Sequence, residues 1–227
     1  MTAACIHIQG GISSNRRSMS PGLWVVLLLL CGHGSLWGQA RREVVQAPAD
    51  VTWWDDLDLA LQAQAEGQDV WAFDGSKLKW KEVPTALREL QDLRYLLMSR
   101  NKLESLPSWL SSMTDLRVVI ADHNRLTSFP DVLLDMPQLV QVSMGENFID
   151  GIPLDIDRMT QLQFLGLWGN VLARFPASLG DLNHLEVLDL LHNDMTEEEQ
   201  ETLKALLPNV RVVMSPPCMC EFEDPQD

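Results

Sequence analysis

The sequence is poor in cysteine and in basic residues, and it has no apolar run of membrane-spanning length. The chain has 17 Lys and Arg residues against 32 Asp and Glu residues, and its formal net charge is −15. Such an acidic surface repels phosphate backbones, and no cluster of basic residues counteracts it, so we expect no nucleic-acid partner. The longest apolar run, Leu23–Cys31, is about half as long as a transmembrane helix.

The few cysteines do not make a disulfide framework. Cys218 and Cys220 are separated by a single residue near the C-terminus. A disulfide across one intervening residue is strained, and no second Cys or His cluster stands nearby in the sequence. We interpret the two cysteines as a solvent-near or capping pair, with a thiol or metal site as the alternative.

The first forty residues have the three parts of a secretory signal peptide. Arg16 and Arg17 precede the apolar run, and Gly38 and Ala40 supply small residues at positions −3 and −1 of a cleavage site. The sequence therefore predicts a signal peptide over residues 1–40. The mature chain would be secreted, periplasmic or at the cell surface, with no stable membrane span after processing. Because all acidic residues follow Ala40, cleavage leaves 15 basic and 32 acidic residues, a net charge of −17.

Three alternatives remain for this segment. Cys31 is a candidate lipoprotein acceptor, although Leu30 stands where a small residue is expected. Translation from Met19 instead of Met1 would give a more ordinary signal peptide. If the segment is not a signal peptide, the chain is a cytoplasmic scaffold.

A repeat of 23 residues occupies most of the remaining chain. Its pattern is Leu-x-x-Leu-x-Leu-x-x-Asn-x-Leu-x-x-Leu-Pro-x-x-Leu-x-x-Leu, with other apolar residues also at the leucine places. The five copies begin at Leu93, Leu116, Leu139, Leu162 and Leu185. Each copy has one asparagine at the same place: Asn101, Asn124, Asn147, Asn170 and Asn193.

Each half of the repeat favours a different local structure. The Leu-x-x-Leu-x-Leu half has the period of two that suits a strand. The Pro-x-x-Leu-x-x-Leu half has a spacing near three, which suits a short helical or 3₁₀ turn that begins with proline. Each asparagine offers two donors and an acceptor to backbone groups at the bend, so we predict that the asparagines form a buried structural ladder.

This pattern resembles the leucine-rich repeat in its typical 23-residue form, over roughly Val70 to Cys218. The resemblance implies an α/β fold: a right-handed solenoid, or short horseshoe, with a concave parallel sheet and short helical or 3₁₀ turns on its convex side. It also implies a protein partner, whose identity it does not give. The ending of the chain, with the segments EEEQ (residues 197–200), LLPNVRV (206–212) and PPCMC (216–220), is similar to the terminal unit of secreted bacterial leucine-rich repeat proteins.

Both ends of the repeat array are predicted to be caps, because an open stack exposes its core. Residues 41–92 form an N-terminal cap with a degenerate first repeat, in which Leu78 replaces the asparagine and residues 55–65 form a helix. Residues 93–193 are the five repeats. Residues 194–227 form a C-terminal cap with a helix, an edge strand at residues 210–213 and an acidic tail. A capping box of Thr196 and Glu199 begins this helix, which ends near Leu207.

The N-terminal cap is rich in tryptophan. We interpret these side chains as a cover for the end of the core, and the alternative is a cell-surface structural or carbohydrate-binding protein that uses this tryptophan-rich cap. The residues are Trp53, Trp54, Trp71 and Trp80.

The residues between the buried leucines of each strand face the concave side and are mostly uncharged. An apolar and aromatic cluster with charges at its rim is typical of a protein interface, although such residues also simply suit a strand. Trp168 is central, because Gly145 and Gly166 are expected to leave room around its indole. The predicted partner-binding residues are Tyr95, Leu97, Arg100, Ile120, Asp122, His123, Phe164, Trp168, Asp189, Leu191 and His192.

The sequence contains no nucleophile motif, phosphate-binding loop or metal-spaced set of His and Cys residues. His123 and His192 hold the same place in repeats that are three turns apart. They would lie about 14 Å from each other, too far to share a metal. We therefore expect a monomeric, non-catalytic recognition module that needs no cofactor and no metal and binds a protein partner through its concave face.

Overall fold

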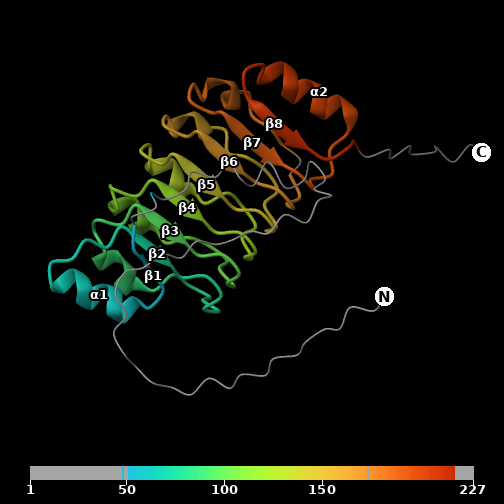
Figure 1. Cartoon of the computed structure of the whole chain (residues 1–227). Coiled ribbons are helices and arrows are strands. Elements are labelled where there is room, and N and C mark those ends of the chain that lie inside the picture. Colours follow the sequence, from blue (N-terminus) through green and yellow to red (C-terminus); the bar gives the residue numbers. More distant parts are fainter. Residues whose placement is uncertain (1–47, 49–50, 173, 218–227) are drawn as a thin grey trace, which may run out of the picture. The chain divides into compact units, whose positions relative to one another are not determined.

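One parallel sheet of eight strands runs through the computed structural model in chain order, from β1 to β8 (Figure 1). The structure describes residues 48, 51–172 and 174–217, which belong to the unit Leu36–Asp227. The predicted signal peptide lies outside these residues, as do Cys218, Cys220 and the acidic tail.

The strands are short and evenly spaced along the chain. Each residue pairs with the residue 23 positions later in the repeats, as Tyr95 does with Val118. The regular register confirms the predicted solenoid. The strands are β1 (Trp53–Trp54), β2 (Ala72–Asp74), β3 (Tyr95–Leu97), β4 (Val118–Ile120), β5 (Gln141–Ser143), β6 (Phe164–Gly166), β7 (Val187–Leu190) and β8 (Arg211–Met214).

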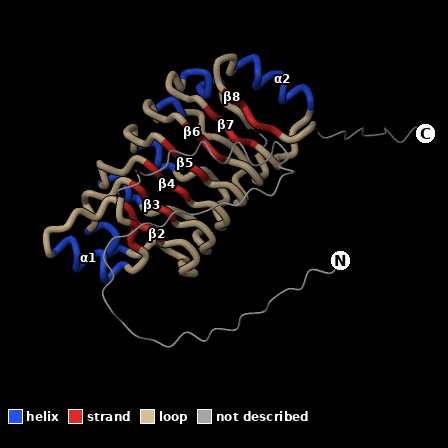
Figure 2. The backbone as a smooth tube through the Cα atoms, viewed as in Figure 1, coloured by secondary structure: helices blue, strands red, loops and turns tan. Residues whose placement is uncertain are grey.

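The second half of the degenerate first unit and of the first four repeats forms a 3₁₀ turn, as the spacing predicts, whereas the fifth repeat continues into α2 (Glu197–Leu206). Figure 2 shows these turns along one side of the row of strands. Proline directly precedes four of the five turns, because its fixed φ suits the start of a helical turn and no hydrogen-bond donor is needed there. The turns are η3 (Thr85–Glu89), η4 (Ser108–Ser112), η5 (Asp131–Asp135), η6 (Ile156–Arg158) and η7 (Ala177–Asp181).

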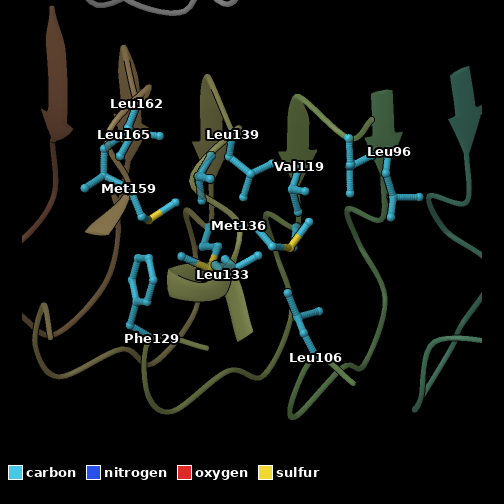
Figure 3. Close-up of a cluster of buried hydrophobic side chains, with 14 of the residues drawn as sticks. Leu96, Leu106, Val119, Phe129, Leu133, Met136, Leu139, Met159, Leu162 and Leu165 are labelled. Carbon is cyan, nitrogen blue, oxygen red and sulfur yellow. The ribbon is translucent and has the colours of Figure 1, made fainter. Parts of the chain in front are cut away.

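The core fills the space between the strands and these turns. Figure 3 shows Leu96, Val119 and Leu165 near the strands, with Phe129 at the opposite end of the core. Leu162, Leu165 and Leu167 have no exposed surface, which confirms their predicted inward phase. Each repeat contributes one layer, and stacking buries every layer against the next.

Two α-helices lie near the ends of the array. Helix α1 (Leu57–Ala65) is capped by Asp56, whose carboxylate accepts a hydrogen bond from the N–H of Leu59 at 3.1 Å. Helix α2 (Glu197–Leu206) begins with the predicted capping box: Glu199 N donates to Thr196 Oγ1, and Thr196 N donates to Glu199 Oε2 at 2.8 Å. No helix of the described residues is long and apolar enough to span a membrane.

The four tryptophans of the N-terminal region differ in their surroundings. Trp54 and Trp80 pack against the core, and Trp80 stacks on Phe73 with 6.3 Å between the ring centroids. Trp71 is half-buried, with the guanidinium of Arg94 at 4.5 Å from its ring.

The prediction that all four tryptophans cover the core is wrong for Trp53 and Trp71, neither of which packs against the core cluster. Trp53 belongs to β1, a strand of two residues, and so short a strand shows no recognisable alternation of apolar and polar residues in the sequence. Through Ala72 it aligns with Tyr95, and its ring centroid lies 6.2 Å from that of Tyr95. Trp53 is 42% exposed and, through Ala72 of β2, extends the row of Tyr95 by two strands.

Candidate functional site

The asparagines hold the bend at the end of each strand. Asn124 Nδ2 donates to the carbonyls of Met98 and Ala121 at 3.0 and 2.9 Å, and its Oδ1 accepts from Leu103 N at 3.0 Å. Asn101, Asn147, Asn170 and Asn193 repeat this arrangement in their own coils. The ladder joins adjacent coils, and it thereby sets the positions of the side chains that precede each asparagine.

The residue immediately before each of these asparagines adopts a left-handed backbone conformation. The φ angles are 59° at Arg100, 54° at His123, 50° at Glu146, 64° at Gly169 and 58° at His192. Residues other than glycine are disfavoured there. The repeat pattern did not predict this row, for which the only signal was a glycine at one of the five equivalent places.

Replacement of Gly169 by alanine should lower the free energy of unfolding by about 1–2 kcal/mol, because a Cβ is strained at positive φ. The same place in the preceding repeat supplies the control, since Glu146→Gly removes a Cβ from a left-handed residue and should not destabilise the chain. Urea denaturation of both variants checks this. Equal losses in the two variants would contradict a backbone origin of the effect.

The outward-facing side chains of the strands form continuous rows, which together we call the strand face. One row aligns Tyr95, Val118, Gln141, Phe164 and Val187. A second row aligns Leu97, Ile120, Ser143, Gly166 and Asp189. The structure thus brings predicted binding residues from separate repeats side by side. Gln141, which is not among the predicted binding residues, lies in the first row, and its buried side-chain amide has no hydrogen-bond partner in the structure.

Trp168 lies on the strand face, outside the core cluster, but the expected room around its indole is absent. A Cβ built on Gly145 would stand 2.1 Å from Trp168 Nε1, so the indole itself occupies the space above that glycine. The space above Gly166 is taken by Ser143 Oγ and the Phe164 ring. The prediction of a vacancy is therefore wrong, because the missing side chains are replaced by neighbouring ones.

Six of the predicted binding residues surround one hollow of about 320 Å³ on the strand face. Asp122 Oδ1 accepts hydrogen bonds from Ser143 Oγ and from Gly145 N, both at 2.7 Å. His123 meets the edge of the Trp168 indole at a centroid distance of 5.4 Å. The six residues are Arg100, Asp122, His123, Phe164, Trp168 and Asp189. Ser99 and Ser143, which the sequence pattern did not single out, complete the lining.

The remaining predicted residues lie outside this hollow. Leu97 and Ile120 are adjacent in register and half-buried, and Tyr95 lies beside Trp53. Leu191 N donates to Asp189 Oδ1 at 3.1 Å, and His192 N donates to Ser215 Oγ at 2.8 Å.

Exposure differs along the strand face. Arg100, His123 and His192 are exposed, whereas Phe164, Trp168 and Asp189 are buried. An accessible apolar cluster lies over β1, β3 and β4, on Trp53, Tyr95, Leu97 and Ile120. Within residues 48, 51–172 and 174–217, no three His, Cys, Asp or Glu side chains gather as a metal site would need.

Comparisons with known proteins agree with this geometry. The family model described as "Leucine Rich Repeat" matches residues 92–113. A leucine-rich repeat protein of Leptospira interrogans is 26% identical and aligns with 63% of this chain and 35% of its own, with a TM-score of 0.54. No curated protein matches the sequence.

Two Listeria monocytogenes structures share the fold. An internalin is 20% identical over 72% of this chain and 46% of its own, with a TM-score of 0.54. Internalin C2 is 19% identical over 64% of this chain and 62% of its own, with a TM-score of 0.51. The chain thus spans less than two thirds of the length of each of these three structures.

Proposed function

We propose, on the premise that this chain is a leucine-rich repeat protein, that it is a non-catalytic module that binds a protein partner through its strand face. The observation that carries the proposal is the accessible apolar cluster of Trp53, Tyr95, Leu97 and Ile120. It stands on a chain of net charge −15. Aromatic and apolar side chains enriched at the centre of a patch, with polar groups around it, are typical of protein interfaces.

The side chains around this cluster suit the same role. Arg100 and His123 are exposed next to it, and their left-handed backbone places them at the ends of β3 and β4. The Asp122 carboxylate is held in place by Ser143 and Gly145. A partner would meet an apolar centre whose charged neighbours are already positioned, which lowers the entropy lost on binding.

The place of action is a second part of the proposal. The predicted signal peptide of residues 1–40 supports an exported protein, which we propose to be monomeric. Sequencing of the N-terminus of the mature protein tests this, with Arg41 expected as the first residue. A mature protein that still begins before Ala40 would favour the cytoplasmic alternative.

A double variant, Leu97→Glu with Ile120→Glu, should abolish partner capture without unfolding the chain, because both side chains are half-buried on the strand face. The matched control is Leu59→Glu, which places the same charge on α1, at a leucine that is 54% exposed. The measurement is affinity capture of extracellular proteins by the mature chain, with circular dichroism as the folding check.

We expect the wild type and Leu59→Glu to retain the same partner and the double variant to lose it. Capture that survives the double variant would refute the strand face as the binding surface. For the carbohydrate alternative, a glycan array probed with the mature chain and with Trp53→Ala distinguishes the two functions, since only a glycan-binding protein would give a signal that this substitution removes.

A further inference from the structure

A second surface lies away from the strand face, where successive coils leave a hollow of about 620 Å³. Its apolar walls include Phe129, Leu154 and Phe175, and its charged walls are Asp131, Asp150 and Arg174. Figure 3 places Phe129 at the end of the core that is farthest from the strands. The hollow therefore opens on the side of the 3₁₀ turns and is separate from the proposed binding face.

Phe175 continues this hollow toward α2. The same ring lines a neighbouring hollow of about 260 Å³, together with Glu198, Glu199 and Leu206 of α2. We call the two hollows on either side of Phe175 the turn-side groove. Leu206 Cδ1 lies 3.0 Å from a Cβ built on Gly180 in η7, so α2 packs directly on the last 3₁₀ turn.

The turn-side groove has an unusually exposed apolar side chain at its edge. Leu154 is 83% exposed, although its backbone is fixed, because Ser178 Oγ donates to the Leu154 carbonyl at 2.7 Å. Phe148 and Val171, which hold one equivalent place in successive repeats, are 58% and 59% exposed. Neither residue lines the groove, whose own accessible apolar side chains include Leu154 and the partly buried Phe175.

The charge around the groove is negative. Asp131, Asp150, Glu198 and Glu199 line it, and Arg174 is the one basic residue among the described residues of both linings. Arg174 is itself paired with Asp150 at 2.9 Å. On the neighbouring turn η6, Arg158 pairs with Asp135 and Asp155, and the hydrogen bonds to these two carboxylates raise its pKa.

We propose that the turn-side groove binds a segment of a partner protein in which lysine or arginine side chains flank an apolar side chain. The apolar side chain would pack against Leu154 and Phe175, and the cations would meet Asp131, Glu198 and Glu199. A second copy of this chain is a poor occupant, because two chains of net charge −15 repel each other.

Three synthetic peptides of equal length test the proposal by fluorescence anisotropy with the full mature chain. One alternates lysine and leucine, one alternates glutamate and leucine, and one alternates lysine and serine. We expect binding of the lysine–leucine peptide alone, weakened by added salt. Leu154→Ser should weaken it about tenfold, since one buried leucine contributes that much. Leu59→Ser, the same change at an exposed leucine of α1, should leave it unchanged.

The variant Arg174→Gln tests whether the turn-side groove prefers cationic peptides over anionic ones. Its ion pair is exposed on both sides, at 73% and 58%, so its loss should not disturb the fold. Without Arg174, Asp150 is released to a cationic ligand, and we expect tighter binding of the lysine–leucine peptide by a few-fold. Weaker binding by Arg174→Gln, equal binding of the glutamate–leucine peptide, or equal losses in Leu154→Ser and Leu59→Ser would overturn the proposal.

Two further outcomes separate binding in this groove from self-association and from binding on the strand face. Light scattering should give a monomer for both the wild type and Leu154→Ser, and a dimer that Leu154→Ser dissociates would overturn the proposal in favour of a second copy. The Leu97→Glu, Ile120→Glu double variant should still bind the lysine–leucine peptide. Loss of peptide binding in that double variant would place the peptide site on the strand face and overturn the proposal for the turn-side groove. This outcome is independent of whether the proposed function is correct.

Discussion

Replacement of Asn147 by alanine should lower the free energy of unfolding by about 3–5 kcal/mol, the largest loss that we expect from any single polar substitution. Asn147 Nδ2 donates to the carbonyls of Ala121 and Met144 at 3.1 and 3.0 Å, and its Oδ1 accepts from Leu126 N at 3.0 Å. The side chain is only 4% exposed, so water cannot replace these bonds without opening the coil. Alanine would leave one backbone N–H and two carbonyls, which belong to two adjacent coils, without this partner.

The measurement for Asn147→Ala is urea denaturation followed by far-ultraviolet circular dichroism. Asn183→Ala is the matched control, because Asn183 is exposed and makes a single hydrogen bond, to the carbonyl of Asp181 at 3.0 Å. We expect a loss of less than about 0.5 kcal/mol there. If the two variants lose the same stability, the asparagine ladder does not hold the coils together and the structural role assigned to it is wrong.

Replacement of Gly145 by alanine should cost about 1–3 kcal/mol, because the new methyl group overlaps the indole of Trp168. The built Cβ lies 2.1 Å from both Nε1 and Cε2 of that ring, well inside van der Waals contact. The indole must then leave its position over the glycine and its edge contact with His123, which is 5.4 Å between centroids. The effect therefore reaches the lining of the hollow on the strand face as well as stability.

A double-mutant cycle with Trp168→Ala identifies the cause of this loss. In the Trp168→Ala background the overlap no longer exists, so we expect Gly145→Ala to cost less than about 0.5 kcal/mol. Gly151→Ala is the control for a methyl group with room, since its nearest neighbour would be Arg174 Nε at 3.4 Å. Additive losses in the cycle would show that the indole does not determine the need for glycine at position 145.

Much of the fold could be predicted from the sequence, because its determinants lie within one repeat or at a fixed distance of one repeat. The strand phase of Leu162, Leu165 and Leu167 follows from a period of two, and all three are buried. The Thr196–Glu199 capping box depends on residues three apart, and the structure contains it. Four of the five 3₁₀ turns directly follow a proline of the repeat pattern. Interactions between residues at a fixed separation require the same residue types at a fixed spacing, and this spacing can be recognised in the sequence.

The tertiary structure alone decided how outward-facing side chains meet. Trp168 and Gly145 are on adjacent coils. The 23-residue period does not predict whether the indole extends into solvent or packs over the neighbouring glycine, as it does in the structure. The left-handed row before the asparagines has arginine, histidine and glutamate in it, so residue type gives little sign of its backbone. The turn-side groove joins Leu154, Phe175 and Leu206, whose proximity depends on how η7 and α2 pack. The repeat thus determined which residues face inward, whereas contacts between coils decided the shape of the surfaces, because these depend on side-chain direction and packing and not on spacing.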